Sequence, residues 1–153
     1  MLHGEDLIHV AIRRFLTKSK WTLLAGQYPG GSDNHLSRLY IRDPTVARDQ
    51  SPDPRRHSRE TFIPDLVAIK DDTILLVEMK PTFSVSDAEK LRKIRGPRFA
   101  DLKRALHEQL GIEIDKPDQV QCGLGFSYDS PFFHLADMRL FRVESLEIVH
   151  EEQ

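Results

Sequence analysis

The sequence predicts an α/β fold in which helices pack against a mixed β-sheet. Two observations lead to this prediction. The hydrophobic periodicity gives the order helix, strand, hairpin, helix, strand and strand. The length of 153 residues suits one domain with an apolar core, and the chain is 39% apolar and 30% charged, as is typical of globular proteins. We therefore expect residues 1–153 to form a single domain.

The first part of the chain combines a helix, a short strand and a long polar segment. Residues 4–18 place apolar side chains at helical spacing, and residues 21–27 are typical of a strand. Residues 28–61 are rich in Pro, Gly, Ser, Asp and Arg, with a weak strand-like stretch only at residues 39–41. A loop of this length is usually functional or disordered.

Residues 62–80 are the most informative segment. Two apolar runs flank the polar break Lys70-Asp71-Asp72, which predicts a β-hairpin. The second run is apolar at consecutive positions, so we expect a central strand buried on both faces. After the hairpin we expect two helices. A capping box at Ser86–Glu89 opens the first, which breaks near Gly96-Pro97, and the second spans 99–110 and is ended by Gly111. A strand at 120–128 and a strand region at 138–149, with a bend at Glu144-Ser145, complete the expected fold.

Composition narrows the function class. The formal net charge of −2 gives no overall basic signature of nucleic-acid binding, although a local basic surface remains compatible with it. One cysteine permits no disulfide within the chain and suits a reducing compartment. Neither a membrane-spanning apolar run nor a signal-peptide pattern is present in the sequence. We therefore expect a cytoplasmic protein without membrane contact.

Three charged side chains gather at one end of the expected hairpin. Asp65 follows Pro64 near the start of the first run, and Glu78 and Lys80 lie two apart at the end of the second. Strand side chains alternate between faces, so Glu78 and Lys80 should share a face while the side chain of Met79 points to the other. The hairpin would bring Asp65 close to this pair.

Two carboxylates and an amine in this arrangement indicate metal-dependent phosphodiester hydrolysis. Mg²⁺ prefers oxygen ligands, so Asp65, Glu78 and the backbone carbonyl of Met79 would suffice together with water and a substrate phosphate. Lys80 could orient or deprotonate the attacking water, or stabilise the pentavalent phosphorane. The protonation state of Lys80 is left open by the sequence.

These residues carry a resemblance to a known superfamily. Pro64-Asp65, followed after a gap by Glu78-Met79-Lys80, resembles the motif of the PD-(D/E)xK nucleases, the restriction-endonuclease-like group. The resemblance implies a core of order αβββαβ, with Asp65 and Glu78 as metal ligands and Lys80 as the catalytic lysine. It also implies Mg²⁺ as cofactor with Mn²⁺ as a substitute, DNA as substrate, and a homodimer or partner subunit for cutting both strands. Many members carry a metal-shell glutamate on the first helix, for which Glu5 is the candidate.

Basic residues near the hairpin are candidates for binding nucleic acid. One group lies in the long loop, and another follows the hairpin on a helix that in this superfamily often faces the substrate. The candidates are Arg48, Arg55, Arg56 and Arg59 in the loop, and Lys90 and Lys93 on the helix. Disorder without function would also explain the loop arginines, and a solvated helix face the lysines.

Plainer interpretations stay open. The hairpin end could be solvated, with Glu78 and Lys80 as a surface ion pair, and Glu5 could simply favour the helix dipole, for which Asp6 is an equal competitor. The chain could also be a non-catalytic nucleic-acid-binding or assembly subunit of the same fold, or an unrelated α/β protein.

Overall fold

A mixed six-stranded β-sheet forms the centre of the molecule in a computed structural model that describes residues 4–27, 36–44 and 61–152. Its strand order is β1-β4-β5-β6-β7-β8. Neighbouring strands are antiparallel from β1 to β5 and between β7 and β8, and parallel from β5 to β7. The strands are β1 (Thr22–Gly26), β4 (Leu66–Lys70), β5 (Thr73–Met79), β6 (Val120–Ser127), β7 (Met138–Val143) and β8 (Val149–Glu152).

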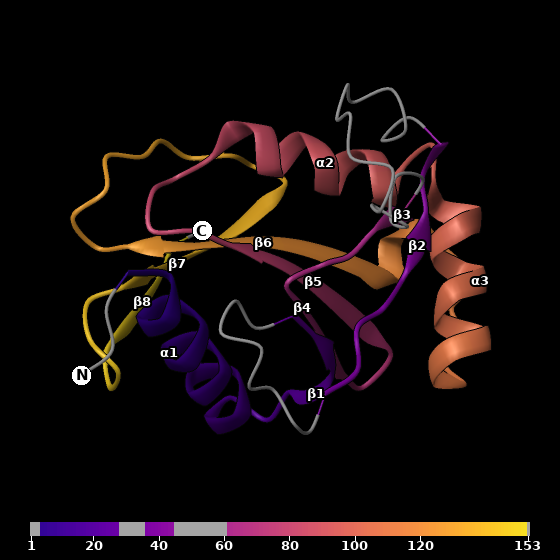
Figure 1. Ribbon diagram of the computed structural model, residues 1–153, viewed down its shortest axis with the longest axis horizontal. Coiled ribbons are helices and arrows are strands. Elements are labelled where there is room, and N and C mark those ends of the chain that lie inside the picture. Colours follow the sequence, from indigo (N-terminus) through magenta and orange to yellow (C-terminus); the bar gives the residue numbers. More distant parts are fainter. Residues whose placement is uncertain (1–3, 28–35, 45–60, 153) are drawn as a thin grey trace, which may run out of the picture.

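Helices cover both faces of this sheet. Helix α1 (Gly4–Lys18) lies on one face, and α2 (Val85–Arg95) and α3 (Phe99–Leu110) lie on the other (Figure 1). The parallel pairing of β5 with β6 requires a crossover connection, which α2 and α3 supply together with a 3-10 turn at Pro117–Gln119. The α/β class expected from the sequence is confirmed.

Helix α1 forms and packs as its periodicity predicts. Its buried residues Ile8, Ala11, Ile12 and Leu16 recur at helical spacing and pack on one face of the sheet. Opposite them β6 carries Gly125, where an added Cβ would lie 2.0 Å from Ile12 Cδ1. The glycine therefore allows α1 to approach the sheet closely.

The β4–β5 hairpin has the predicted buried character. All residues of β5 after Thr73 are buried, and the strand lies between β4 and β6. The Asp71-Asp72 loop is tight, and Asp71 adopts a left-handed φ of 55° as two-residue hairpin loops require. Residues 74 and 76 pack toward α2 and α3, whereas residues 75, 77 and 79 pack toward α1.

The long loop contains a small second sheet. Strand β2 (Ile41–Arg42) pairs with β3 (Thr61–Phe62), so the start of the expected hairpin segment pairs outside the main sheet and the hairpin itself begins at Leu66. Leu39 and Ile41 are fully buried, which explains the weak apolar stretch in the sequence. Much of the loop predicted over 28–61 lies outside the described residues.

The start of α2 differs from the prediction. The N-cap is Ser84, whose Oγ accepts a hydrogen bond from the Asp87 backbone N–H at 3.2 Å, and not Ser86. Both serines precede an acidic residue by three positions, so the sequence pattern alone could not separate them. A start at Ser84 places Ala88 and Leu91 in the core, and burial therefore decides.

The end of the chain also departs from expectation. The strand region predicted at 138–149 is two antiparallel strands, because the expected bend at Glu144-Ser145 is a full chain reversal closed by a Glu144 N–H to Ile148 carbonyl bond of 2.9 Å. The helix break at Gly96 and the αL cap at Gly111 are confirmed. No helix in the described ranges has the length and apolar character needed to cross a membrane.

Candidate active site

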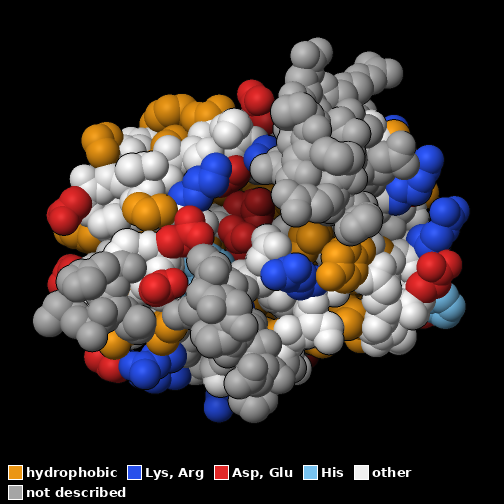
Figure 2. Space-filling model, viewed as in Figure 1, with side chains coloured by type: hydrophobic (Ala, Val, Ile, Leu, Met, Phe, Trp, Pro, Cys, Tyr) orange, Lys and Arg blue, Asp and Glu red, His pale blue; other side chains and the backbone are white. Residues whose placement is uncertain are grey.

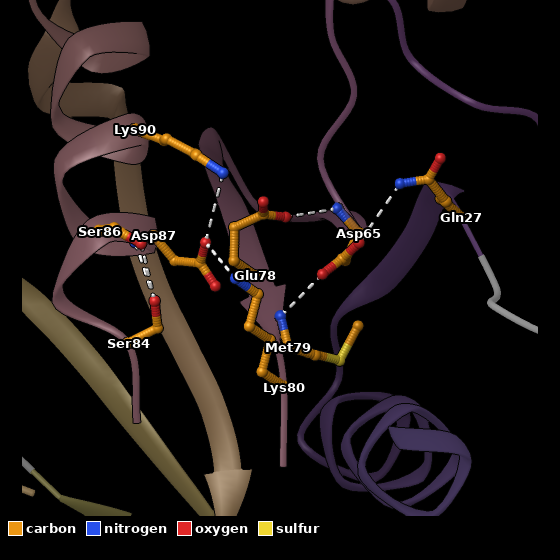
Figure 3. A network of polar contacts seen from close by, with 9 residues as sticks. All are labelled: Gln27, Asp65, Glu78, Met79, Lys80, Ser84, Ser86, Asp87 and Lys90. Atoms are coloured by element: carbon orange, nitrogen blue, oxygen red, sulfur yellow. Dashed lines mark hydrogen bonds and ion pairs between the residues drawn. The ribbon is translucent and has the colours of Figure 1, made fainter. Parts of the chain in front are cut away.

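Asp65 and Glu78 meet across the open end of the hairpin. Leu66 pairs with Val77, so the next residues outward, Asp65 and Glu78, stand opposite each other and share the face toward α2. Figure 3 shows the two side chains directed at one another. The proximity expected from the sequence is therefore present.

At the open end of the hairpin, the two carboxyl groups take the place of backbone carbonyls as hydrogen-bond acceptors. The Asp65 backbone N–H donates to Glu78 Oε2 at 2.8 Å, and the Met79 backbone N–H donates to Asp65 Oδ2 at 2.8 Å (Figure 3). Each side chain thus satisfies a backbone amide of the opposite strand. This exchange fixes both carboxyl groups in place and gives them a structural role besides any chemical one.

Burial makes ionisation of this pair costly. The pKa of Glu78 is raised well above its ordinary value, first by burial and then by the nearby charge of Asp65. The pKa of Asp65 is also raised, because burial outweighs the stabilising hydrogen bonds from Met79 and Gln27. A pair with these properties favours either a shared proton or a bound cation.

Lys80 extends from the end of β5 to the start of α2. Its Nζ lies 3.1 Å from Asp87 Oδ1, and Lys90 Nζ lies 3.8 Å from the same oxygen. The Asp87 side chain is only 3% exposed, whereas both lysines are about half exposed. The charge of Asp87 contributes to the raised pKa of Glu78, so this third acid belongs to the same electrostatic cluster. Acidic side chains with a lysine or arginine beside them gather near the centre of the face in Figure 2.

Gln27 holds Asp65 from the other side. Its Nε2 donates to Asp65 Oδ1 at 3.4 Å, and its backbone N–H donates to the Asp65 carbonyl at 2.9 Å. The residue directly follows β1, the antiparallel neighbour of β4, so the sheet itself brings it to Asp65.

Glu5 lies in the first turn of α1, within electrostatic range of the pair. Its charge is among the causes that raise the pKa of Asp65. Asp6 shares the same helical turn but is not among those causes. A metal-shell role for Glu5 stays a prediction.

The expected metal donors form a small set. Within the described ranges, no cluster of three or more His, Cys, Asp or Glu side chains is arranged to hold a metal ion. The expected set contains only two carboxylates, Asp65 and Glu78, with the Met79 carbonyl. The Met79 N–H faces Asp65, and in a strand the carbonyl of the same residue points to the same side. One or two carboxylates with several waters are the usual protein contribution to a Mg²⁺ site, so this donor set fits that ion.

The predicted nucleic-acid-binding residues are distributed unevenly. Lys90 belongs to the site because its Nζ forms an ion pair with Asp87, whereas Lys93 forms a 3.0 Å ion pair with the buried Asp43. Lys93 therefore connects α2 to the segment after β2. The four loop arginines lie outside the described residues: Arg48, Arg55, Arg56 and Arg59.

Sequence reasoning missed two residues of the cluster. Asp87 carries a usable signal, because it stands at the third helical position after Ser84 and one turn before Leu91, on the side that packs against the sheet. Gln27 carries none, since its contact depends on the pairing of β1 with β4. Gln121, by contrast, is exposed and accepts a hydrogen bond from Arg139 at 3.0 Å, away from Glu78.

Comparison of the chain with models of known protein families and with curated proteins gave no match.

Proposed function

We propose that this protein is a divalent-metal-dependent phosphodiesterase, and specifically a DNA endonuclease of the PD-(D/E)xK type. The observation that carries the proposal is the pairing of the partly buried Asp65 with the buried Glu78 across the open end of the hairpin, with Lys80 two residues beyond Glu78. Buried acids with raised pKa values near a lysine are more common at functional sites than in purely structural clusters.

The order of elements supports the same proposal. A helix precedes the antiparallel strands β1, β4 and β5, and α2 then leads to β6, which is parallel to β5. This order resembles the restriction-endonuclease-like core. In that core the residues that correspond to Asp65 and Glu78 hold metal at the open end of the hairpin.

Each residue has a proposed task. Asp65, Glu78 and the Met79 carbonyl hold Mg²⁺, with Glu5 as a further ligand from α1, and Mn²⁺ substitutes. When bound, the ion supplies Lewis-acid activation of the phosphodiester and of a water molecule. Lys80 donates hydrogen bonds from its ammonium group to orient that water or to neutralise charge that develops on the phosphate oxygens.

Asp87 positions Lys80 in this scheme. A nearly buried carboxylate at 3.1 Å restricts the flexible lysine chain. Lys90, which meets the same oxygen at 3.8 Å, is placed to bind the flanking phosphate backbone together with Lys93 and the loop arginines. A homodimer or partner subunit would bring a second site to the opposite strand.

The test is cleavage of supercoiled plasmid by the purified chain. We expect nicking with Mg²⁺ or Mn²⁺ and none with chelator. The variant Lys80→Ala should lose about 100-fold or more of this activity while DNA binding is retained, because the lysine acts in the chemical step. Lys103→Ala, at an exposed position of α3, is the matched control and should cleave normally. Wild-type activity in Lys80→Ala, or cleavage that persists in chelator, would contradict the assignment.

One observation favours a second candidate, a non-catalytic nucleic-acid-binding or assembly subunit. Asp65 and Glu78 each accept a backbone hydrogen bond that closes the hairpin end, so the fold alone gives them a role. The net charge of −2 also fits a modest affinity for nucleic acid. DNA binding without metal-dependent nicking, and without change in Lys80→Ala, would favour this candidate.

A further inference from the structure

A second polar site lies at the opposite end of the central strands from Glu78. A pocket of about 680 Å³ opens where β6 and β7 begin, beside the last turn of α2. Val120 in its wall pairs with Ile74, whereas Glu78 pairs with Leu124. The offset of four residues places the two regions about 13 Å apart along the strands. The pocket is therefore separate from the hairpin site.

Arginine dominates the charge of this pocket. Its lining holds Arg95 and Arg139 with the single carboxylate of Asp137, and Arg92 lines an adjoining pocket that shares Arg95 and Asp137. Arg92 binds Asp137 through two nitrogens, with Nη2 at 2.9 Å from Oδ1. Arg139 likewise binds Glu151 through Nε at 2.7 Å and Nη2 at 2.9 Å. Three arginines and two carboxylates leave one positive charge, and it resides on Arg95.

The side chain of Arg95 is held but not neutralised. Its Nε donates to the Val120 carbonyl at 2.7 Å, and it forms no ion pair with a carboxylate among the described residues. The two terminal nitrogens therefore keep their N–H donors for a ligand. Because the Nε bond already fixes the guanidinium plane, little rotational freedom is lost when an anion binds.

Cys122 adds no negative charge to the pocket. It is one of the lining residues, and burial raises the pKa of its thiol to about 12, so the sulfur stays neutral at physiological pH. Val120 and Met138 add apolar surface, which strengthens the electrostatic attraction of nearby charges by excluding water. The volume lies within the range of ordinary small-molecule sites.

We propose that this pocket binds a phosphate group through the free N–H donors of Arg95. Planar guanidinium donors match phosphate oxygens in pairs. The phosphate could belong to a mononucleotide or to the backbone of a nucleic-acid strand, and the experiment below distinguishes these sources. The proposal does not depend on phosphodiester cleavage at Glu78.

The rival explanation is that the arginines only stabilise the helix. Arg92 and Arg95 both lie in the last turn of α2, where positive charge offsets the helix dipole. That explanation does not cover Arg139, which comes from β7, lines the same pocket and is bound by Glu151 and Gln121.

The proposal is tested by NMR titration of the full chain in chelator. Inorganic phosphate, adenosine 5′-monophosphate and a short single-stranded oligonucleotide are added separately at constant ionic strength. We expect saturable shifts of the Val120, Gln121 and Met138 amides and of the Arg95 Nε–H. Arg95→Gln should raise the dissociation constant about tenfold or more, as expected for loss of a charged hydrogen-bond donor. Arg14→Gln, at an exposed arginine paired with Glu147, should leave it unchanged.

Arg95→Lys provides a second variant in case Arg95→Gln fails to fold. It keeps the charge but loses the planar pair of donors, so we expect an intermediate affinity. Tighter binding of the oligonucleotide than of the mononucleotide assigns the site to a nucleic-acid strand, and the reverse assigns it to a nucleotide. The proposal is overturned if none of the three probes gives saturable shifts at this pocket, or if the folded Arg95 variants bind as the wild type does.

Discussion

The two ends of the central strands treat their acid groups in opposite ways. At the hairpin end, Asp65 and Glu78 receive hydrogen bonds from backbone amides and have raised pKa values, because burial outweighs those bonds. At the other end, the exposed Asp137 is bound by the guanidinium of Arg92, and the pKa of that carboxyl is lowered. Of these acids, only Asp137 has a full countercharge.

This difference separates a structural pair from a candidate functional one. The Arg92–Asp137 pair lies at the surface and is complete without a ligand, so its removal should cost little. The Asp65–Glu78 pair keeps a deficit of positive charge that a proton or a metal ion would satisfy. Sites that sacrifice stability in this way are often retained for activity.

The strongest test of the comparison is Glu78→Gln. We expect metal-dependent nicking to fall more than about 100-fold, since a ligand is lost. In chelator at pH 8 the same variant should be more stable than the wild type by about 1–3 kcal/mol, because the amide carries no buried charge. Plasmid nicking and chemical denaturation measure the two effects.

Glu108→Gln is the matched control, because it makes the same chemical change at an exposed position of α3. It should alter neither quantity. A Glu78→Gln protein that is less stable than the wild type in chelator would mean that the carboxylate serves mainly to close the hairpin.

Asp87→Asn should have the next largest effect. Without its carboxylate partner, Lys80 loses the contact that positions it, and we expect the turnover rate to fall about 10- to 100-fold with little change in KM. Steady-state kinetics on an oligonucleotide substrate give the measurement. Lys90→Ala keeps the closer Lys80 contact and should retain most of the turnover rate, whereas an unchanged rate in Asp87→Asn would remove Asp87 from the mechanism.

The pH dependence of stability should have opposite signs at the two ends of the central strands. The folded protein retains the Glu78 proton above the ordinary pKa of 4.5, so this group's contribution to the free energy of unfolding is present below that pH and is lost as pH rises through the folded pKa. The contribution of Asp137 is present above its ordinary pKa of 3.8 and is lost as pH falls below it.

Thermal unfolding in chelator from pH 3 to 8 separates these contributions. The difference between wild type and Glu78→Gln should grow above about pH 4.5, and added Mg²⁺ should reduce it. The difference between wild type and Asp137→Asn should shrink toward the acid end of the series, as pH falls below 3.8 toward the lowered folded pKa. Parallel curves for wild type and Glu78→Gln would show that Glu78 titrates normally.

The smallest expected effect is that of Asp137→Asn at neutral pH. The Asp137 side chain is 44% exposed, and exposed ion pairs contribute about 0–1 kcal/mol. Nicking should be unaffected, because the residue lies at the end of the central strands away from Glu78. A loss of nicking in this variant would show that the two ends are functionally connected.

Much of the fold could be predicted because its signals are local. The stripe of Ile8, Ile12 and Leu16 gives α1, and the Asp71-Asp72 break gives the hairpin. Gly111 ends α3 through its positive φ. The prediction was wrong where two residues fit the same local pattern, as Ser84 and Ser86 both fit an N-cap. It was also wrong before β8, where the same polar residues are typical of a bend and of a full chain reversal.

The candidate site was predictable to the extent that one hairpin builds it. Asp65 and Glu78 follow from strand register, and Lys80 follows from alternation along β5. Gln27 reaches Asp65 only through the pairing of β1 with β4, and Asp87 reaches Lys80 only through the packing of α2 on the sheet. Such contacts between distant segments leave no periodic pattern in the chain.

The hydrogen bonds between carboxyl groups and backbone amides at the hairpin end have a consequence for detecting ligands. The amide hydrogens of Asp65 and Met79 are covered by side-chain oxygens and not by a neighbouring strand. An ion that draws these oxygens toward itself changes how tightly the amides are covered, and a solvent-exchange measurement at these two positions would register the change. The hairpin thus contains its own reporter for cation binding, one that can be observed in protein that cleaves nothing.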